Sequence, residues 1–527
     1  MHLRERLSIR WLILLVVVLF VAAACGGDDD AADGDGGAGA SDVTIVHGTT
    51  DSVVSLDPAG AYDLGSWTII YNTHNGLLTI PPGSSTPEPE LAESCDFDDA
   101  KTYTCTLQEG LQFSDGSELT ADDVKFSIDR NIKIADPQGA SSLLGSLDEV
   151  EVVDDQTVTF HLKADDATWP FILTTPAAFI VPDDSYDPKK KAADEDSIGA
   201  GPYQLAEYRP GEQAVLEANP NYHGDAPANS RVIISYFDKS SALKLAIEQG
   251  EVDVAYRSLT ATEIEDLRDA DGVEVVEGNG TEIRYLVFNL KFPPGDDLAV
   301  RKAVAQTIDR QAIVDNVYLG TVKPLYSMVP EGLAGHVDSF ADVFGQTPDV
   351  DAAKKTLEAA GIATPVEIEI WWTPTHYGDL SADEYTEIKR SLEESGLFEV
   401  TLKSTEWDQY SEAAFTDKYP IYQLGWFPDY TDPDNYTSPF YSKDSFLNIH
   451  YNDPKMNDLL AQQKASTDPD EREQIFQQIQ QLAVEDIPII PIWQGDQVGV
   501  VREGVTGVED TFDPSFQFRY WLIGKSE

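Results

Sequence analysis

The sequence has 527 residues, of which 93 are Asp or Glu and 36 are Lys or Arg, so its formal net charge at pH 7 is -57. Such an excess of carboxylates repels phosphate backbones and anionic lipid headgroups, which excludes nucleic acid as a partner. The chain is longer than one hydrophobic core organises, so two or three domains are expected.

The N-terminal segment predicts a cleavable signal peptide over residues 1–24. Three arginines precede an apolar run from Trp11 to Ala24, which ends in three alanines. A charged start, a short apolar core and small residues before the cut are typical of secretory signals. The run has 14 residues, fewer than the roughly 20 that a membrane-spanning helix needs. We therefore expect a mature chain without a transmembrane helix.

Cys25 follows these alanines, and the pattern resembles a bacterial lipobox, although Ala22 stands where leucine is usual. Lipidation of Cys25 would anchor the chain at the extracytoplasmic face of the cell membrane, because two or more acyl chains bind a bilayer stably. The alternative is plain secretion. Residues 25–41 consist almost entirely of Gly, Ala and Asp, a composition that predicts a flexible tether.

The two remaining cysteines, Cys95 and Cys105, predict a disulfide in this oxidising location. They flank turn residues at 98–101 between extended segments, so we expect a β-hairpin with the disulfide across it. The alternative, a metal or redox site of the CxxC type, lacks both the spacing and the partners.

Beyond the hairpin, helical and strand-like patterns interleave. This order predicts an α/β or mixed α+β fold. Alternating apolar residues predict strands in 150–162, 232–237, 284–289 and 366–372. Helical periodicity occurs in 121–131, 239–249, 298–318, 349–360, 383–395 and 470–485.

No catalytic motif, metal motif or cofactor motif is present. The sequence lacks HExxH, GxSxG and GxxxxGK[ST], and its histidines are scattered singly. A carboxylate pair of the glycosidase type stays open, because acidic residues are too abundant for sequence spacing to be informative. We expect a protein that is not an enzyme and needs no cofactor.

Six phrases, in order along the chain, resemble the bacterial extracellular solute-binding proteins of family 5, the peptide and nickel receptors of ABC importers. They are FSDGSELTADDVKFSIDR (113–130), GAGPYQLAEYRPGEQAVLEANPNYHG (199–224), DDLAVRKAVAQTIDRQAIVDNVYLG (296–320), EWDQY (406–410), GWFPDYTDPDNY (425–436) and QQIQQLAVEDIPIIPIW (477–493).

The resemblance implies a two-lobe, hinge-connected α/β fold of the periplasmic-binding-protein type II, with an extra domain inserted in the first lobe. Lobe I would comprise 42–75, 199–283 and 486–527, the inserted domain 76–198, and lobe II 284–485. Such a receptor would be a monomer that closes on its ligand and delivers it to permease subunits.

The fifth phrase concentrates aromatic and acidic residues in a proline-rich loop, as a solute pocket requires. By resemblance, Asp429 would bind the α-ammonium of a peptide, and Trp426 would line the same cavity. Asp432 and Asp434 are interpreted as turn residues, with a calcium loop as the alternative.

The same resemblance nominates Tyr62 and Trp493 as further walls of the pocket, and for either aromatic the alternative is a place in the core. In dipeptide receptors an arginine binds the ligand carboxylate, and its place falls at or near Tyr377 in this sequence. Without that arginine, longer peptides fit better than dipeptides. A nickel chelate, an oligosaccharide or another small solute stays open, as does an extracellular hydrolase.

Overall fold

The computed structural model describes residues 43–374 and 376–526. The predicted signal peptide (1–24), the tether (25–41) and Cys25 lie outside the described residues. Within the described ranges, no helix is both long enough and apolar enough to cross a membrane.

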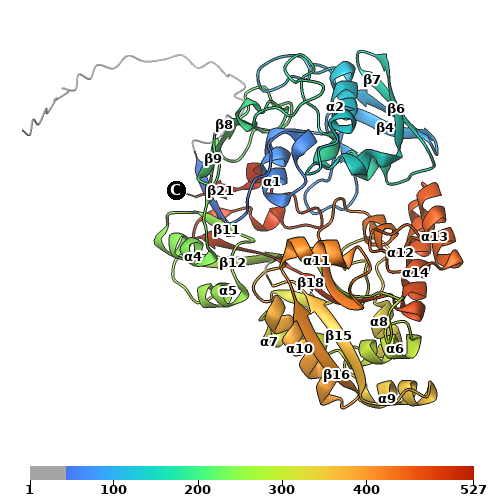
Figure 1. Ribbon diagram of the computed structural model, residues 1–527. Coiled ribbons are helices and arrows are strands. Elements are labelled where there is room, and N and C mark those ends of the chain that lie inside the picture. The colour runs from blue at the N-terminus through green and yellow to red at the C-terminus, as the bar shows by residue number, and fades with distance from the viewer. Residues whose placement is uncertain (1–42, 375, 527) are drawn as a thin grey trace, which may run out of the picture. The chain divides into compact units, whose positions relative to one another are not determined.

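A seven-stranded sheet joins segments from both ends of the chain (Figure 1), in the order β12-β19-β11-β1-β10-β9-β8. Strand β1 runs parallel to β10 and β11, whereas β19 returns from the C-terminal part of the chain and pairs antiparallel with β11 and β12. The strands are β1 (Thr44–Thr49), β8 (Tyr203–Arg209), β9 (Gln213–Ala218), β10 (Arg231–Tyr236), β11 (Val254–Tyr256), β12 (Val273–Gly278) and β19 (Gln497–Arg502).

A six-stranded sheet has the order β14-β18-β13-β17-β15-β16. Every residue of β13 is buried, as expected for a central strand with both faces covered. The strands are β13 (Ile283–Phe288), β14 (Val322–Pro324), β15 (Val366–Trp372), β16 (Phe398–Ser404), β17 (Ile421–Trp426) and β18 (Ile489–Gly495).

A third, four-stranded antiparallel sheet lies within the predicted inserted domain and has the order β4-β5-β7-β6. Strands β4 (Ala92–Asp99) and β5 (Thr102–Leu107) form the expected hairpin, and a disulfide joins Cys95 to Cys105 across it. Strands β6 (Leu147–Asp154) and β7 (Thr157–Leu162) complete the sheet. Two further sheets have two short strands each. They pair β2 (Leu78–Thr79) with β3 (Glu88–Pro89) and β20 (Val505–Thr506) with β21 (Gly524–Lys525).

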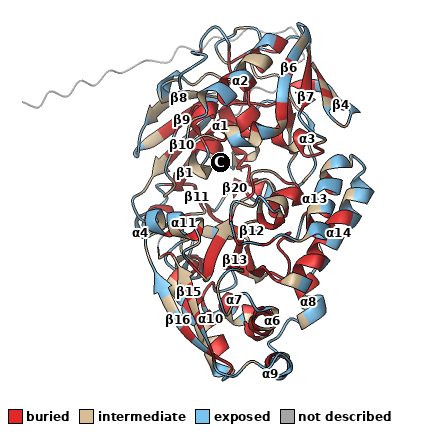
Figure 2. Cartoon of the chain, turned by 45° about the vertical axis from the view of Figure 1, so that its right-hand side comes forward, coloured by how far each residue is buried: buried red, intermediate tan, exposed pale blue. Residues whose placement is uncertain are grey.

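Helices surround these sheets, with buried residues gathered on the strands and exposed residues on the outer sides of helices such as α13 and α14 (Figure 2). The helices are α1 (Leu64–Thr73), α2 (Ala121–Ile134), α3 (Trp169–Ile172), α4 (Ser240–Gln249), α5 (Ala261–Leu267), α6 (Leu298–Thr307), α7 (Arg310–Asn316), α8 (Ser339–Phe344), α9 (Val350–Ala359), α10 (Ser381–Glu394), α11 (Trp407–Ala414), α12 (Ser438–Tyr441), α13 (Pro454–Ala465) and α14 (Pro469–Asp486). This interleaving of helices and strands confirms the α/β prediction.

The prediction of one continuous helix over 298–318 is wrong, because the chain breaks between α6 and α7. Ile308 has extended backbone dihedrals, and the side chain of Asp309 accepts a hydrogen bond from the backbone N–H of Ala312. An aspartate that caps a new helix start offers the backbone a competing arrangement. The apolar periodicity continues across the break, since Ile308 and Ile313 are both buried.

The boundaries of the lobes stay a prediction. Within the segment 486–527, β18 is hydrogen-bonded into the six-stranded sheet, whereas β19 belongs to the seven-stranded sheet. The chain therefore passes from one sheet to the other between Gly495 and Gln497.

A buried ion pair fixes the loop before α1 to the predicted inserted domain. The guanidinium of Arg130, on α2, donates to both carboxylate oxygens of Asp57 at 2.8 and 2.6 Å, and neither side chain is more than 2% exposed. Asp57 also accepts from the backbone N–H groups of Ala59 and Ala192. A buried pair of this kind is stable only while both partners and their hydrogen bonds are present.

We expect Asp57→Asn to lower the free energy of unfolding by about 3–5 kcal/mol, because it leaves the buried Arg130 charge without its partner. Urea unfolding followed by circular dichroism measures the change. Asp129→Asn is the matched control, since Asp129 lies one residue before Arg130 and its side chain is 51% exposed. Equal stability of the two variants would contradict the assigned role of the pair.

Candidate functional site

A cavity of about 400 Å³ lies between the loop that precedes α1 and the loop that follows β17. Its wall is mostly aromatic, and its acidic residues are Asp63 and Asp429. The wall comprises Tyr62, Asp63, Leu64, Trp67, Tyr285, His376, Tyr377, Trp407, Phe415, Leu424, Gly425, Trp426, Phe427, Pro428, Asp429 and Phe446. An apolar, concave wall with few polar groups is the usual form of a small-ligand site.

Asn435 holds the carboxylate of Asp429 in place at one end of this cavity. The side-chain amide of Asn435 donates to Asp429 Oδ2 at 3.0 Å. Its oxygen accepts from the backbone N–H of Asp429 at 3.0 Å and from Nε1 of Trp426 at 2.9 Å. One amide thus orients both the carboxylate and the neighbouring indole.

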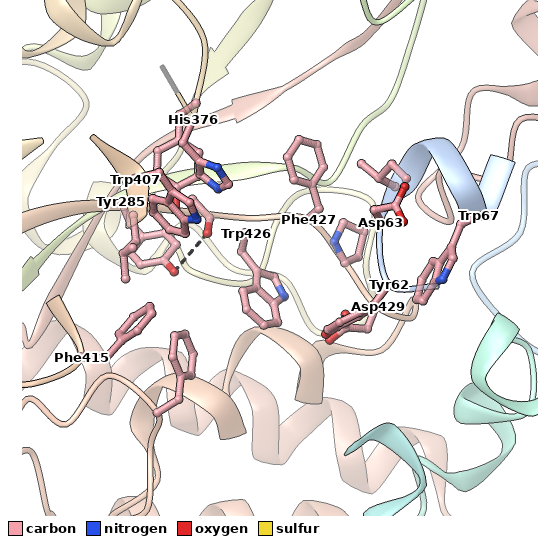
Figure 3. A pocket seen from close by; sticks show the side chains of 16 residues that line it. Tyr62, Asp63, Trp67, Tyr285, His376, Trp407, Phe415, Trp426, Phe427 and Asp429 are labelled. Atoms are coloured by element: carbon pink, nitrogen blue, oxygen red, sulfur yellow. Dashed lines mark hydrogen bonds between the residues drawn. The ribbon is translucent and has the colours of Figure 1, made fainter. Parts of the chain in front are cut away.

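Tyr62 reaches Asp429 from the opposite wall. Its hydroxyl donates to Asp429 Oδ1 at 2.6 Å, which joins segments 367 positions apart in the sequence. Figure 3 shows Tyr62 and Asp429 side by side, with Trp426 and Phe427 between this pair and the Trp407 side of the cavity. Tyr62 is 42% exposed, so this contact lies at the edge of the cavity.

The surroundings of Asp429 favour a ligand cation. Burial raises the pKa of Asp429, and the hydrogen bonds from Tyr62 and Asn435 oppose that rise. Both donors are neutral, and within residues 43–374 and 376–526 no cationic side chain pairs with Asp429. A desolvated carboxylate without a counter-charge is stabilised by a ligand that brings one.

Asp63 is the second carboxylate of the wall, and it caps a helix. Its side chain caps α1 by accepting from the backbone N–H of Ser66 at 2.8 Å. Burial raises the pKa of Asp63 as well.

Asp432 and Asp434 are engaged in holding the loop. Asp432 accepts two hydrogen bonds from the guanidinium of Arg472 at 2.7 and 2.8 Å, and it also accepts from the backbone N–H of Asp434. Asp434 lies 3.5 Å from Nζ of Lys464. Among the described residues, no group of three or more His, Cys, Asp or Glu is arranged to hold a metal ion.

Tyr377 also lines the cavity, and an arginine lies against its ring. The guanidinium carbon of Arg284 is 4.3 Å from the centre of the Tyr377 ring. Burial raises the pKa of Tyr377 to about 12, so the phenol stays neutral. Nearby, the rings of His376 and Trp407 stack at 3.6 Å.

The structure brings four of the five predicted ligand-binding residues to one cavity: Tyr62, Tyr377, Trp426 and Asp429. Trp493 does not line it. Its side chain is only 4% exposed and packs on Tyr318, with the ring centres 4.7 Å apart. The pleat of β18 directs Trp493 into the core, which was the alternative for this residue.

Sequence reasoning missed several wall residues. Phe427 and Trp407 stand within two of the phrases quoted above, so the signal for them was available. Phe415 and Phe446 carry no local signal, because their position depends on how separate segments pack together.

Comparisons with known proteins agree with this fold. The model of the bacterial extracellular solute-binding proteins, family 5 (middle region), matches residues 86–448, which are 363 of the 527 residues. The probable D,D-dipeptide-binding periplasmic protein DdpA of Escherichia coli (strain K12) is 25% identical over 505 residues, covering 90% of this chain and 92% of that protein. The oligopeptide-binding protein OppA of Bacillus subtilis (strain 168) is 26% identical over 484 residues, covering 86% and 88%.

Among solved structures, the ABC transporter-associated periplasmic binding protein DppA from Helicobacter pylori, in complex with peptide STSA, has a TM-score of 0.76 at 22% identity. The match covers 92% of this chain and 98% of that one. This likeness confirms the predicted two-lobe binding-protein fold. Because the family model spans well over half of the sequence, this chain belongs to the bacterial extracellular solute-binding proteins of family 5.

Proposed function

We propose that this chain is the substrate-binding component of an ABC importer, and that it captures peptides outside the membrane by their N-terminal ammonium group. Relatives named as dipeptide-binding and oligopeptide-binding proteins support the peptide class. A lipid on Cys25 and the tether to residue 41 would keep the receptor close to its permease. The protein would act as a monomer and would catalyse no reaction.

The observation that carries this proposal is the carboxylate of Asp429. It lies in an aromatic cavity and is oriented by two neutral donors. A peptide ammonium would form a charge-assisted hydrogen bond there, while aromatic walls accommodate varied side chains. Contacts from the ligand to both the Tyr62 loop and the Asp429 loop would favour a closed form of the protein.

Native mass spectrometry of the soluble chain without residues 1–25 tests the proposed class. After incubation with a defined mixture of peptides of two to eight residues, we expect intact peptides to be retained and to raise the melting temperature. Cleavage of the peptides would favour the hydrolase. Retention of a sugar or a metal chelate in competition, with no peptide bound, would contradict the peptide class.

Asp429→Asn should cost about 2–5 kcal/mol of peptide binding free energy, because it removes the charge that pairs with the ammonium. Isothermal titration calorimetry with one retained peptide measures the loss. Asp444→Asn is the matched control, since Asp444 is exposed and lies in the same part of the chain. The N-acetylated peptide should bind the wild type as weakly as the free peptide binds Asp429→Asn. An unchanged affinity of that variant would remove Asp429 from the site.

Peptide affinity should also fall on acidification, beginning above the pH at which an ordinary aspartate takes up its proton. Burial raises the pKa of Asp429, and only the ionised carboxylate attracts an ammonium. Affinity is therefore full above that pKa and is lost as the pH falls through it. The peptide ammonium stays charged throughout, since its pKa is about 8.

Calorimetry between pH 4 and pH 7 checks this dependence. Burial and Arg284 lower the pKa of His376, in the same wall, to about 4, so this side chain stays neutral over most of the range. Asp429→Asn provides the comparison, and its residual affinity should be almost flat. A wild-type profile as flat as that of the variant would contradict the assignment.

A further inference from the structure

A second cavity, of about 700 Å³, adjoins the first, and Tyr377 lines both. One side is formed where the parallel strands β1 and β11 end, at Thr50 and Arg257. The other side is formed by 377–380 together with Tyr318 and Thr321. Ligands of open α/β sheets commonly bind at the carboxyl ends of such strands.

Arg257 is the residue of this second cavity that calls for an explanation. Its backbone has a φ of +62°, in the left-handed region that residues other than Gly, Asn and Asp rarely adopt. Its guanidinium carbon lies 5.1 Å from the centre of the Phe427 ring, which belongs to the wall of the first cavity. Uncommon backbone conformations that persist beside a cavity are frequent in ligand sites.

The guanidinium of Arg257 has no partner of opposite charge in contact. Asp51 and Glu282 act on it electrostatically, yet no ion pair or hydrogen bond joins its side chain to another described residue. Glu282 is already paired with Arg284, at 2.6 Å. In a protein of net charge -57, a cation that lines a cavity without a bound carboxylate is available for an acidic ligand group.

Two other cations lie close by but fit this task less well. Arg284 is almost fully buried, is paired with Glu282 and lines neither of the two cavities. Lys239 does line the second cavity, but it is exposed. An ammonium is also a point charge, whereas the planar fork of an arginine matches both oxygens of a carboxylate.

We propose that Arg257 binds the C-terminal carboxylate of a short peptide whose N-terminal ammonium lies at Asp429, an inference that rests on the proposed function. Phe427 connects the two charged residues, because it is two residues from Asp429 in sequence and its ring contacts the guanidinium of Arg257. Two residues span at most about 7 Å, so with the contact to Arg257 and the lengths of the side chains the charges are at most on the order of 18 Å apart. A peptide that bridges them has about two to four residues. This distance favours short peptides, in contrast to the longer ligands expected from the absence of an arginine at Tyr377.

Calorimetry with matched peptides tests this inference. The probes are Ala-Leu, Ala-Leu-Ala, Ala-Leu-Ala-Ala and an octapeptide with the same first three residues, each as the free acid and as the C-terminal amide. We expect the wild type to prefer the free acids of two to four residues. Amidation of the tightest-binding peptide should lower its affinity on the order of 10- to 100-fold, which is the effect of losing one charged hydrogen-bonded contact.

Arg257→Gln should lower the affinity for the free-acid peptide by that same factor, and amidation of the peptide should then lower the affinity no further. Lys239→Gln is the matched control, because it removes one positive charge from the same cavity, and it should keep the full amidation effect. Arg257→Lys, which keeps the positive charge but lacks the planar guanidinium, should retain part of the amidation effect. Melting temperatures of the three variants show whether each is folded.

Three results would overturn the inference. In the first, the wild type binds the free acid and the amide equally. In the second, the wild type binds the octapeptide as tightly as the short peptides. In the third, the effect of amidation on affinity survives in Arg257→Gln or disappears in Lys239→Gln. The first two need no variant, so they hold even if Arg257→Gln does not fold. In each case peptides still bind, which leaves the proposed function intact. Binding of no peptide by the wild type would contradict the proposed function as well.

Discussion

The carboxylate of Asp429 is the group on which the rest of the site depends. It is desolvated and held by neutral donors, and within residues 43–374 and 376–526 no cationic side chain pairs with it. The structure fixes it from several directions: Asn435 sets its orientation, while Arg472 and Lys464 hold the same loop from outside through Asp432 and Asp434. These two cations, on α14 and α13, are thereby paired with carboxylates other than Asp429.

The hydrogen bond from Tyr62 extends this constraint to the opposite wall. Tyr62 lies on the short segment between the 3-10 turn Pro58–Gly60 and α1, and Asp57 caps that turn while it pairs with Arg130. The position of the Tyr62 hydroxyl therefore depends on a buried ion pair that does not touch the cavity. Because the two walls belong to segments far apart in the sequence, a ligand that contacts both contributes binding free energy to their approach.

The fold could be predicted from the sequence to the extent that its signals are local. The capping box of Thr120 and Asp123 begins α2, and the hairpin with Cys95 and Cys105 follows from turn residues between alternating strands. The break at Ile308 was missed because the apolar stripe continues through it. For the site, the resemblance to family 5 nominated Trp426 and Asp429 within the dense aromatic loop. Arg257 lacked any such signal, since only the pairing of β1 with β11 brings the ends of these strands together.

Net charge and local charge therefore act on different properties of this protein. The total of -57 acts over a distance that salt limits to about 8 Å at physiological ionic strength. It favours solubility and the approach of cationic groups, but it does not discriminate between ligands of similar charge. Discrimination needs charges that are desolvated and fixed, as Asp429 is by Asn435 and as Arg257 is by its strand end and the Phe427 ring. A negative charge at one end and a positive charge at the other complement a zwitterion of matching length, and a free ammonium or carboxylate alone satisfies only half of that arrangement.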